Sequence, residues 1–288
     1  MTNGPSRQDG PIRTVRSRTG AAMPALGQGT WEMGVKAVSG REEADALRLG
    51  LDLGMTLIDT AEMYGDGGAE EVVGKAILGR RDGIFLVSKV LPQNASREGT
   101  VLAAERSLKR LRTDRIDLYL LHWPGSHPVE ETLEGFRELR DAGKILHYGL
   151  SNFDTAEMAS AAAMPGGEIL AADQVLYNLR RRGIERNLLP WCTERGIVIM
   201  AYSPLDQGKL LSGRGLDSVA RRHGVTATTV AVAWSMRRDG VVTIPKSSRP
   251  EHVRQNAAAA SLDLTTGDLA ELDAAFPAPR QDIPLETA

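Results

Sequence analysis

Eight short apolar runs alternate along this chain with longer stretches that have helical hydrophobic spacing. The runs lie at 26–29, 56–59, 84–89, 116–122, 146–151, 171–175, 198–202 and 241–245. Parallel strands need a crossover of a dozen or more residues, usually a helix, so this alternation is typical of consecutive βα units. The pattern predicts a parallel sheet with helices covering it.

An open doubly wound sheet and a closed barrel both satisfy this pattern. The glycine fingerprint Gly-x-Gly-x-x-Gly, which marks the dinucleotide-binding form of the open sheet, does not follow the first run. Eight repeats are the number that a barrel needs, and 288 residues are close to the usual size of about 250. The sequence therefore predicts a (β/α)8 TIM barrel, as a single domain over residues 1–288.

The segments outside the repeats carry their own signals. Residues 12–15 and 21–26 flank Arg16-Ser-Arg-Thr-Gly20, which predicts an N-terminal β-hairpin with glycine in its turn. Residues 1–11 are interpreted as a polar tail and 277–288 as a C-terminal tail. Two helix starts are expected from capping boxes, Ser39 to Glu42 and Asp154 to Glu157.

Composition limits the partners of the chain. It is 42% hydrophobic and 25% charged, as in ordinary globular proteins, and its net charge of -2 predicts neither a nucleic-acid nor a membrane partner. The single cysteine, Cys192, excludes an intramolecular disulfide and is expected to be a small buried hydrophobe on a helix. No apolar run approaches the roughly 18 residues of a membrane span, and no signal peptide is apparent. We expect a cytoplasmic protein.

The unusual polar residues fall at the carboxyl ends of the predicted strands. In a (β/α)8 barrel these ends form one face, which carries the active site, so the residues are expected to converge. Tyr64 lies in a loop five residues after the end of the second strand. The strand-end residues are Asp59, Lys89, His122, Ser151, Asn152, Gln174, Tyr202 and Lys246.

Four of these residues form a chemically meaningful group. A phenol with a pKa near 10 is a weak acid at neutral pH. The ammonium of Lys89 is expected to lower the pKa of Tyr64, while Asp59 keeps Lys89 charged and His122 donates a hydrogen bond to a carbonyl oxygen. Singly, each has a structural alternative: a helix cap, a solvated charge, a satisfied histidine or a partly buried aromatic. No set of side chains has metal-ligand spacing, so a cofactor is expected to supply electrons.

Several motifs resemble the aldo-keto reductase superfamily, in order, over residues about 22 to 277. Gly27-Gln-Gly-Thr-Trp31, Ala61-Glu-Met-Tyr64 and Leu189-Pro-Trp-Cys192 are most similar to bacterial members described as methylglyoxal reductases. The family motifs are Leu57-Ile-Asp-Thr-Ala-Glu-Met-Tyr64, Val87-Ser-Lys89, Leu121-His-Trp-Pro124, Gly149-Leu-Ser-Asn-Phe153, Asp173-Gln-Val-Leu-Tyr-Asn178, Ala201-Tyr-Ser-Pro-Leu205, Ile244-Pro-Lys-Ser247 and Gln255-Asn256.

The resemblance implies a monomeric reductase that uses NADPH to convert an aldehyde or ketone to an alcohol, with Tyr64 as proton donor. Its catalytic residues are Asp59, Tyr64, Lys89 and His122. Ser151, Asn152 and Gln174 hold the nicotinamide carboxamide, and Tyr202 stacks on the ring. The other cofactor-binding residues it implies are Gly29, Thr30, Trp31, Ser203, Leu205, Lys246, Ser247, Arg249, His252, Gln255 and Asn256.

The substrate pocket is expected to lie between Trp31, Tyr64, His122 and Trp123. General packing is the alternative for the two tryptophans. The loop after His122 leads within a few residues to a helix near Glu130, which is too short for an extended groove. Small dicarbonyls and short aldehydes, methylglyoxal first, are therefore the expected substrates.

A phosphate site is expected directly after the eighth strand. Ser248 to Glu251 is interpreted as a capping box with Pro250 in the first helical turn, and the free N–H groups of a helix start bind phosphate. Many members of the resembled family have an arginine where this chain has His252. We expect Arg249 to replace that arginine at the 2′-phosphate.

Two other functions remain open from the sequence. One is a barrel that binds cofactor to report redox state to a partner protein. The other is a barrel lyase or hydrolase, although its metal ligands or paired acidic residues are not apparent.

Overall fold

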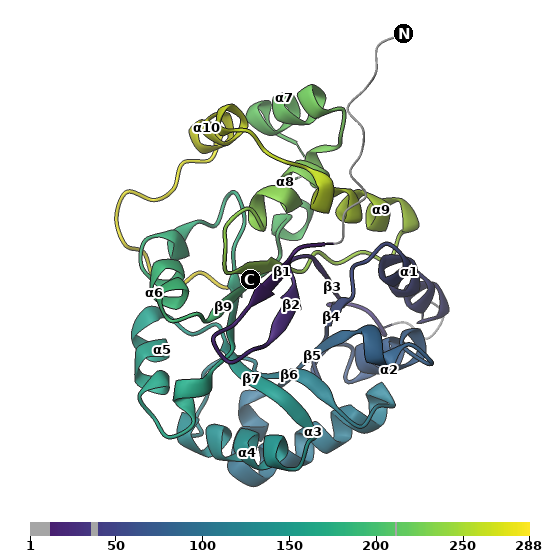
Figure 1. The fold of residues 1–288 in the computed structure, drawn as a ribbon, viewed down its shortest axis with the longest axis vertical. Coiled ribbons are helices and arrows are strands. Elements are labelled where there is room, and N and C mark those ends of the chain that lie inside the picture. Colours follow the sequence, from purple (N-terminus) through teal and green to yellow (C-terminus); the bar gives the residue numbers. More distant parts are fainter. Residues whose placement is uncertain (1–11, 36–39, 211) are drawn as a thin grey trace.

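The structure is a computed structural model that describes residues 12–35, 40–210 and 212–288. Eight parallel strands form its centre and helices surround them (Figure 1). The strands are β3 (Gly27–Gly29), β4 (Leu57–Asp59), β5 (Phe85–Val90), β6 (Ile116–Leu121), β7 (Ile145–Ser151), β8 (Ala172–Leu176), β9 (Val198–Tyr202) and β10 (Val241–Thr243). The eight predicted strands are confirmed, with ends displaced by one or two residues.

The first and last strands of this sheet meet, which closes the barrel. Leu26 and Thr243 form a parallel bridge, as do Gly29 and Lys246, and the backbone N–H of Gly29 donates to the carbonyl of Pro245 at 3.1 Å. A side chain at Gly29 would collide here, because a Cβ would lie 2.9 Å from the carbonyl oxygen of Ile244. The (β/α)8 prediction is confirmed, and the open sheet is excluded.

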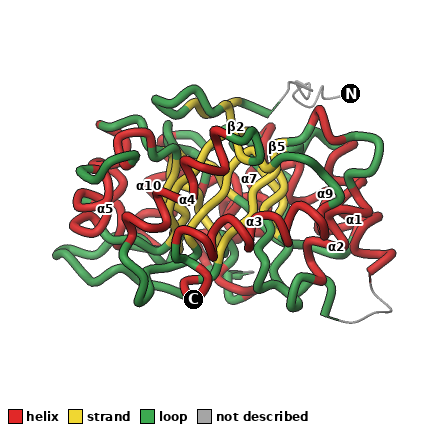
Figure 2. The backbone as a smooth tube through the Cα atoms, turned by 90° about the horizontal axis from the view of Figure 1, so that it is seen from below, coloured by secondary structure: helices red, strands yellow, loops and turns green. Residues whose placement is uncertain are grey.

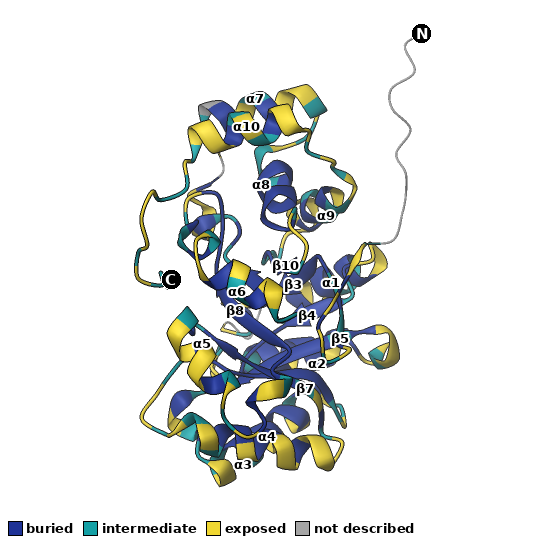
Figure 3. Cartoon of the chain, turned by 60° about the vertical axis from the view of Figure 1, so that its left-hand side comes forward, coloured by how far each residue is buried: buried dark blue, intermediate teal, exposed yellow. Residues whose placement is uncertain are grey.

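Helices cover the outside of the barrel. The strands are buried on both faces, whereas the helices expose their outer sides (Figure 3). The helices are α1 (Gly40–Asp52), α2 (Gly68–Ala76), α3 (Arg97–Leu111), α4 (Val129–Asp141), α5 (Thr155–Ala162), α6 (Leu188–Glu194), α7 (Arg214–His223), α8 (Ala227–Ser235), α9 (Pro250–Ala258) and α10 (Thr266–Ala275). Within the described ranges, no helix combines the length and apolar character needed to cross a membrane.

The predicted hairpin consists of β1 (Thr14–Arg16) and β2 (Ala22–Pro24), paired antiparallel. Gly20 has a φ of 88°, so the turn uses the left-handed conformation that glycine adopts without strain. Val15 and Met23 pack into the apolar cluster inside the barrel. The hairpin therefore closes one end of the barrel, and the chain end labelled C lies at the opposite end (Figure 2). The end of the barrel opposite the hairpin, where the strands have their carboxyl ends, is therefore open to form a site.

The helix caps agree with the sequence in part. Asp154 and Glu157 form the predicted capping box of α5. Ser39 lies outside the described residues. The capping box predicted at Ser248 is wrong, because α9 begins at Pro250 and is preceded by Arg249, whose side chain makes no capping hydrogen bond among the described residues. The predicted proline in the first turn is confirmed, and its fixed φ favours this helix start.

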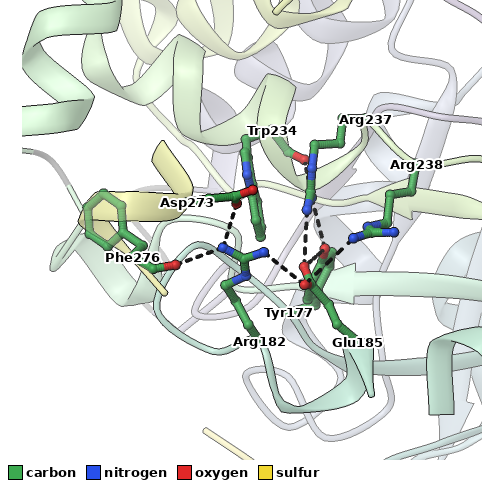
Figure 4. A network of polar contacts seen from close by, with 8 residues as sticks. All are labelled: Tyr177, Arg182, Glu185, Trp234, Arg237, Arg238, Asp273 and Phe276. Atoms are coloured by element: carbon green, nitrogen blue, oxygen red, sulfur yellow. Dashed lines mark hydrogen bonds and ion pairs between the residues drawn. The ribbon is translucent and has the colours of Figure 1, made fainter. Parts of the chain in front are cut away.

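A polar network fastens the segment between β8 and α6 to the end of α10 (Figure 4). Arg182 donates to Glu185 at 2.8 Å, to Asp273 at 2.7 Å and to the carbonyl of Phe276 at 2.7 Å. Its guanidinium lies 5.0 Å from the ring of Trp234 on α8. Both terminal nitrogens of the buried arginine are thus paired, and they fix the point where the C-terminal tail leaves α10.

Candidate active site

A cavity of about 1,100 Å³ lies at the carboxyl ends of the barrel strands. Its walls come from the loops after β3, β4, β6, β9 and β10, from the ends of β7 and β8, from the start of α8, from α9 and from the chain end. It brings together most of the residues predicted from sequence. These are Gly29, Thr30, Trp31, Asp59, Tyr64, His122, Trp123, Ser151, Asn152, Gln174, Tyr202, Ser203, Leu205, Lys246, His252, Gln255 and Asn256.

Lys89 lies in β5 and is completely buried. Its Nζ donates to Asp59 Oδ1 at 2.7 Å and to the carbonyl of Thr60 at 2.8 Å, and it lies 3.4 Å from the hydroxyl of Tyr64. Burial alone would lower the pKa of Lys89, but the charge of Asp59 and the contact with Tyr64 raise it above its usual value. The ammonium is therefore charged at neutral pH and faces the phenol.

Asp59, the last residue of β4, uses both carboxylate oxygens. Oδ1 accepts from Lys89, and Oδ2 accepts from Gln174 Nε2 at 2.7 Å. Gln174 lies in β8, across the barrel, so this bond crosses its interior. Such contacts hold a buried carboxylate in one orientation. Gln174, which the sequence links only to cofactor binding, therefore also orients the carboxylate of Asp59.

Tyr64 differs from the sequence expectation in its acidity. Burial raises its pKa above the usual value, and Lys89 lowers it by a smaller amount, so the net shift is upward. The expected lowering of the Tyr64 pKa by Lys89 is present, but desolvation of the phenolate outweighs it, which the sequence did not predict. The hydroxyl is protonated at neutral pH and can supply a proton to a ligand in the cavity.

His122 follows β6 and remains uncharged. Burial, aided by the nearby charge of Lys89, lowers its pKa to about 2. Its ring lies edge-on to that of Tyr64, with centroids 5.6 Å apart. Its Nδ1 is buried and has no hydrogen-bond partner among the described residues. A neutral imidazole has one donor and one acceptor nitrogen, so His122 can donate a hydrogen bond without carrying a charge.

Asn152 and Tyr202 form a second polar group beside this one. Asn152 Nδ2 donates to the carbonyl of His122 at 3.0 Å, and the hydroxyl of Tyr202 donates to Asn152 Oδ1 at 2.8 Å. Asn152 has a φ of 60°, a left-handed conformation that asparagine tolerates better than most residues. Ser151 Oγ donates to the carbonyl of Gln174 at 2.8 Å. The predicted carboxamide-binding residues therefore lie together.

The far end of the cavity contains Lys246, His252, Gln255 and Asn256. Asn256 is buried, and its Oδ1 has no hydrogen-bond partner in the described ranges. A buried acceptor without a partner costs free energy, so this oxygen is suited to an N–H group of a ligand.

Ser247 and Arg249 are not part of the cavity wall that the described residues form. The backbone N–H of Arg249 donates to Ser247 Oγ at 3.1 Å, which is a local turn before α9. Arg249 is exposed, whereas Lys246 and His252 on either side of it in sequence line the cavity. Contact of Ser247 and Arg249 with a phosphate stays a prediction.

Sequence reasoning missed several wall residues. Thr226, Ala227 and Thr228 line the cavity at the start of α8, where Thr226 Oγ1 accepts from the N–H of Thr229 at 3.2 Å. A threonine three residues before another polar residue is a helix-start signal that was available in the sequence. Gln207, Gly208, Thr287 and Ala288 also line the cavity, from irregular segments without such a signal.

Comparison with known proteins settles the family. A profile of the aldo/keto reductase family matches residues 25–276. The chain belongs to the aldo/keto reductase family. The match includes every strand of the barrel and all of the wall residues except Thr287 and Ala288.

Individual members of the family resemble the chain over nearly its whole length. Methylglyoxal reductase YeaE of Escherichia coli is 49% identical, covering 90% of this chain and 93% of the relative. Glyoxal reductase of Bacillus subtilis is 33% identical, with 91% and 92% covered. A crystal structure of an aldo/keto reductase from Klebsiella pneumoniae, in complex with NADP and acetate, has a TM-score of 0.93 and 46% identity, covering 96% of this chain and 99% of that one.

Proposed function

We propose that this aldo/keto reductase uses NADPH to reduce small reactive aldehydes and ketones, methylglyoxal among them, to alcohols. The observation that carries the proposal is that Tyr64 and His122 line one cavity and that the charged Lys89 lies buried behind the protonated Tyr64. The methylglyoxal and glyoxal reductases among the relatives support this substrate class.

The cavity fits a dinucleotide. Its volume of about 1,100 Å³ slightly exceeds the usual range of ligand pockets, about 300–1,000 Å³, so a large cofactor and a small substrate can share it. Ser151, Asn152 and Gln174 would hold the carboxamide, while Lys246 and the first turn of α9 would face the phosphates. Asn256 Oδ1 would accept from the base.

NADPH, when bound, supplies the hydride. The protein positions the substrate carbonyl oxygen between Tyr64 and His122, and both groups donate hydrogen bonds that polarise it. Tyr64 Oη would donate its proton to this oxygen and so complete the reduction of the carbonyl to an alcohol. The ammonium of Lys89, held by Asp59, then stabilises the phenolate that remains.

Aromatic side chains surround the part of the cavity that holds Tyr64 and His122. Trp123 packs against His122 with ring centroids 4.7 Å apart, and Trp31 lines the mouth. The helix α4 begins at Val129, so the loop between His122 and this helix is short, as expected from the sequence. These features favour a short carbonyl compound over a steroid or a hexose.

Two measurements test this function. Fluorescence titration of the unliganded protein with NADPH should give saturable, tight binding. Steady-state kcat/KM with NADPH should be higher for methylglyoxal than for an aromatic aldehyde, a hexose or a ketosteroid. A ketosteroid that turns over fastest would contradict the preference for short carbonyl compounds, and an absence of NADPH binding would contradict the function.

We also propose a cellular location and an oligomeric state for the protein. The lone Cys192 is buried on α6, as expected, and burial raises the pKa of its thiol, so it is a poor nucleophile. A chain with one inert thiol needs no oxidising compartment, and we place it in the cytoplasm as a monomer. Size-exclusion chromatography with light scattering should give a mass near 31.1 kDa.

A further inference from the structure

The C-terminal tail crosses the face of the barrel that carries the cavity. Residues 277–288 form neither helix nor strand, yet two ion pairs fasten them. Arg186 Nε lies 2.7 Å from Asp282 Oδ1, and Arg181 Nη1 lies 2.6 Å from Glu286 Oε1. Both arginines belong to the segment between β8 and α6. The two ion pairs can be compared directly, because only Arg181 also contacts a residue next to the cavity wall, Asp206.

Packing between the ion pairs brings the chain end to the cavity. A Cβ on Gly183 would lie 2.9 Å from the side chain of Ile283, so the tail lies directly on the barrel here. Thr287 and Ala288 then line the cavity. Tyr202 lines the same cavity as these two residues. The tail is therefore a wall of the site.

The backbone of Arg181 is held by hydrogen bonds in a turn. Its backbone N–H donates to Asn178 Oδ1 at 3.0 Å, in a turn that Asn178 and Arg181 close with a bridge. Asn178 Nδ2 also donates to the carbonyl of Ser203 at 2.9 Å. The guanidinium thus projects from a turn that is already bonded to the start of the loop after β9.

The same guanidinium faces a buried carboxylate in that loop. Arg181 Nε lies 3.7 Å from Asp206 Oδ1, and Arg180 Nε lies 3.7 Å from Oδ2, which has no hydrogen-bond partner in the described part of the chain. Asp206 is only 6% exposed. A buried carboxylate depends strongly on its counter-ions, so Asp206 and the two arginines hold each other in place.

The backbone of this loop is strained. Asp206 and the next residue, Gln207, have φ values of 49° and 54°, and Ser203 has 49°. Such conformations persist only where surrounding contacts impose them, and they are common at ligand clamps. Gln207 and Gly208 line the cavity directly beyond Asp206. The loop 203–208 therefore combines a strained backbone with direct exposure to the cavity.

We propose that Arg181 is a positioning residue that couples the loop 203–208 to the tail, so that NADPH held against the loop also orders the wall formed by the chain end. The coupling passes from Gln207 and Asp206 through Arg181 to Glu286. This inference rests on the proposed function, because NADPH is the ligand that sets the loop. Arg186 also fastens the tail but contacts no residue of the loop among its described ion pairs.

Backbone hydrogen exchange of residues 282–286 tests the coupling, since these residues do not line the large cavity. In the wild type, saturating NADPH should slow this exchange. In Arg186→Gln the exchange should be faster at the start, but NADPH should still slow it. In Arg181→Gln and in Glu286→Gln the slowing should be lost, and Arg181→Lys should restore part of it through its charge.

Steady-state kinetics provide a second measurement on the same variants. Arg181→Gln should raise KM for methylglyoxal roughly two- to fivefold, the range expected for a partly exposed ion pair, with little change in kcat. The coupling would be overturned if NADPH still slowed hydrogen exchange of residues 282–286 in Arg181→Gln. It would also be overturned if the slowing were lost equally in Arg186→Gln. Either result would leave the proposed function intact. Failure of the wild type to bind NADPH would instead overturn the proposed function and this inference with it.

Discussion

The ammonium nitrogen of Lys89 lies 3.4 Å from the hydroxyl oxygen of Tyr64. Burial raises the pKa of the phenol, and Lys89 opposes this rise without reversing it. Tyr64 is therefore protonated before reaction, and its anion has a positive charge beside it after the proton has left. An acid of this kind suits proton delivery to a carbonyl oxygen at neutral pH.

Replacement of Lys89 should remove activity and stability together. In Lys89→Met, Asp59 keeps a buried carboxylate without its counter-ion, which typically costs about 3–5 kcal/mol in the free energy of unfolding. The pKa of Tyr64 should rise, because the ammonium that lowers it is gone. Urea denaturation and the pH-rate profile measure both effects.

The double variant Asp59→Asn with Lys89→Met separates the two effects. It leaves no unpaired charge, so its stability should recover most of the loss while carbonyl reduction stays low. Equal instability of the single and double variants would show that lost packing, and not an uncompensated carboxylate, explains the defect.

His122 should make the fold sensitive to mild acid. Its pKa falls from 6.5 to about 2 on folding, so below pH 6.5 the unfolded chain binds a proton that the folded protein does not. The free energy of unfolding should then fall by about 1.4 kcal/mol per pH unit, and its loss from this group should be complete near pH 2. Between pH 7 and 5, wild type should lose about 2 kcal/mol more than His122→Gln. Parallel losses in both proteins would remove His122 as the cause.

Arg249 is predicted to read the 2′-phosphate from the rim of the cavity. Arg249→Ala should weaken NADPH more than NADH, by roughly ten- to a hundredfold, the usual cost of a charge-assisted contact. Arg254, also exposed on α9 but not part of the cavity wall, is the matched control. If both cofactors weaken equally, or if Arg254→Ala has the same effect, His252 becomes the residue to test.

The barrel could be predicted from the sequence because its signals are local and repeated. Each strand is a short apolar run, and Asp59, Lys89 and His122 follow from the position of a strand end. The hydrogen bond between Gln174 and Asp59 could not be predicted, since it joins residues 115 positions apart across the closed barrel. The net acidity of Tyr64 depends on the balance of burial and charge, which only the packed structure provides.

The sequence also could not predict which irregular segments would form walls of the cavity. Thr287 and Ala288 enter the cavity because ion pairs and the packing of Ile283 guide the tail, and none of these contacts has a sequence period. The capping of α9 could not be predicted for a related reason. Ser248 had the right spacing for a cap, but the turn formed by Ser247 and Arg249 places the helix start at Pro250.

The most direct test of the account is NADPH-dependent reduction of methylglyoxal by wild type and Tyr64→Phe side by side. The substitution removes only the hydroxyl, so the fluorescence titration should give an unchanged Kd for NADPH. Without the proton donor, kcat should fall by about 10²- to 10⁴-fold, the usual contribution of a general acid. Full turnover by Tyr64→Phe, with NADPH bound as in the wild type, would contradict the central role of Tyr64.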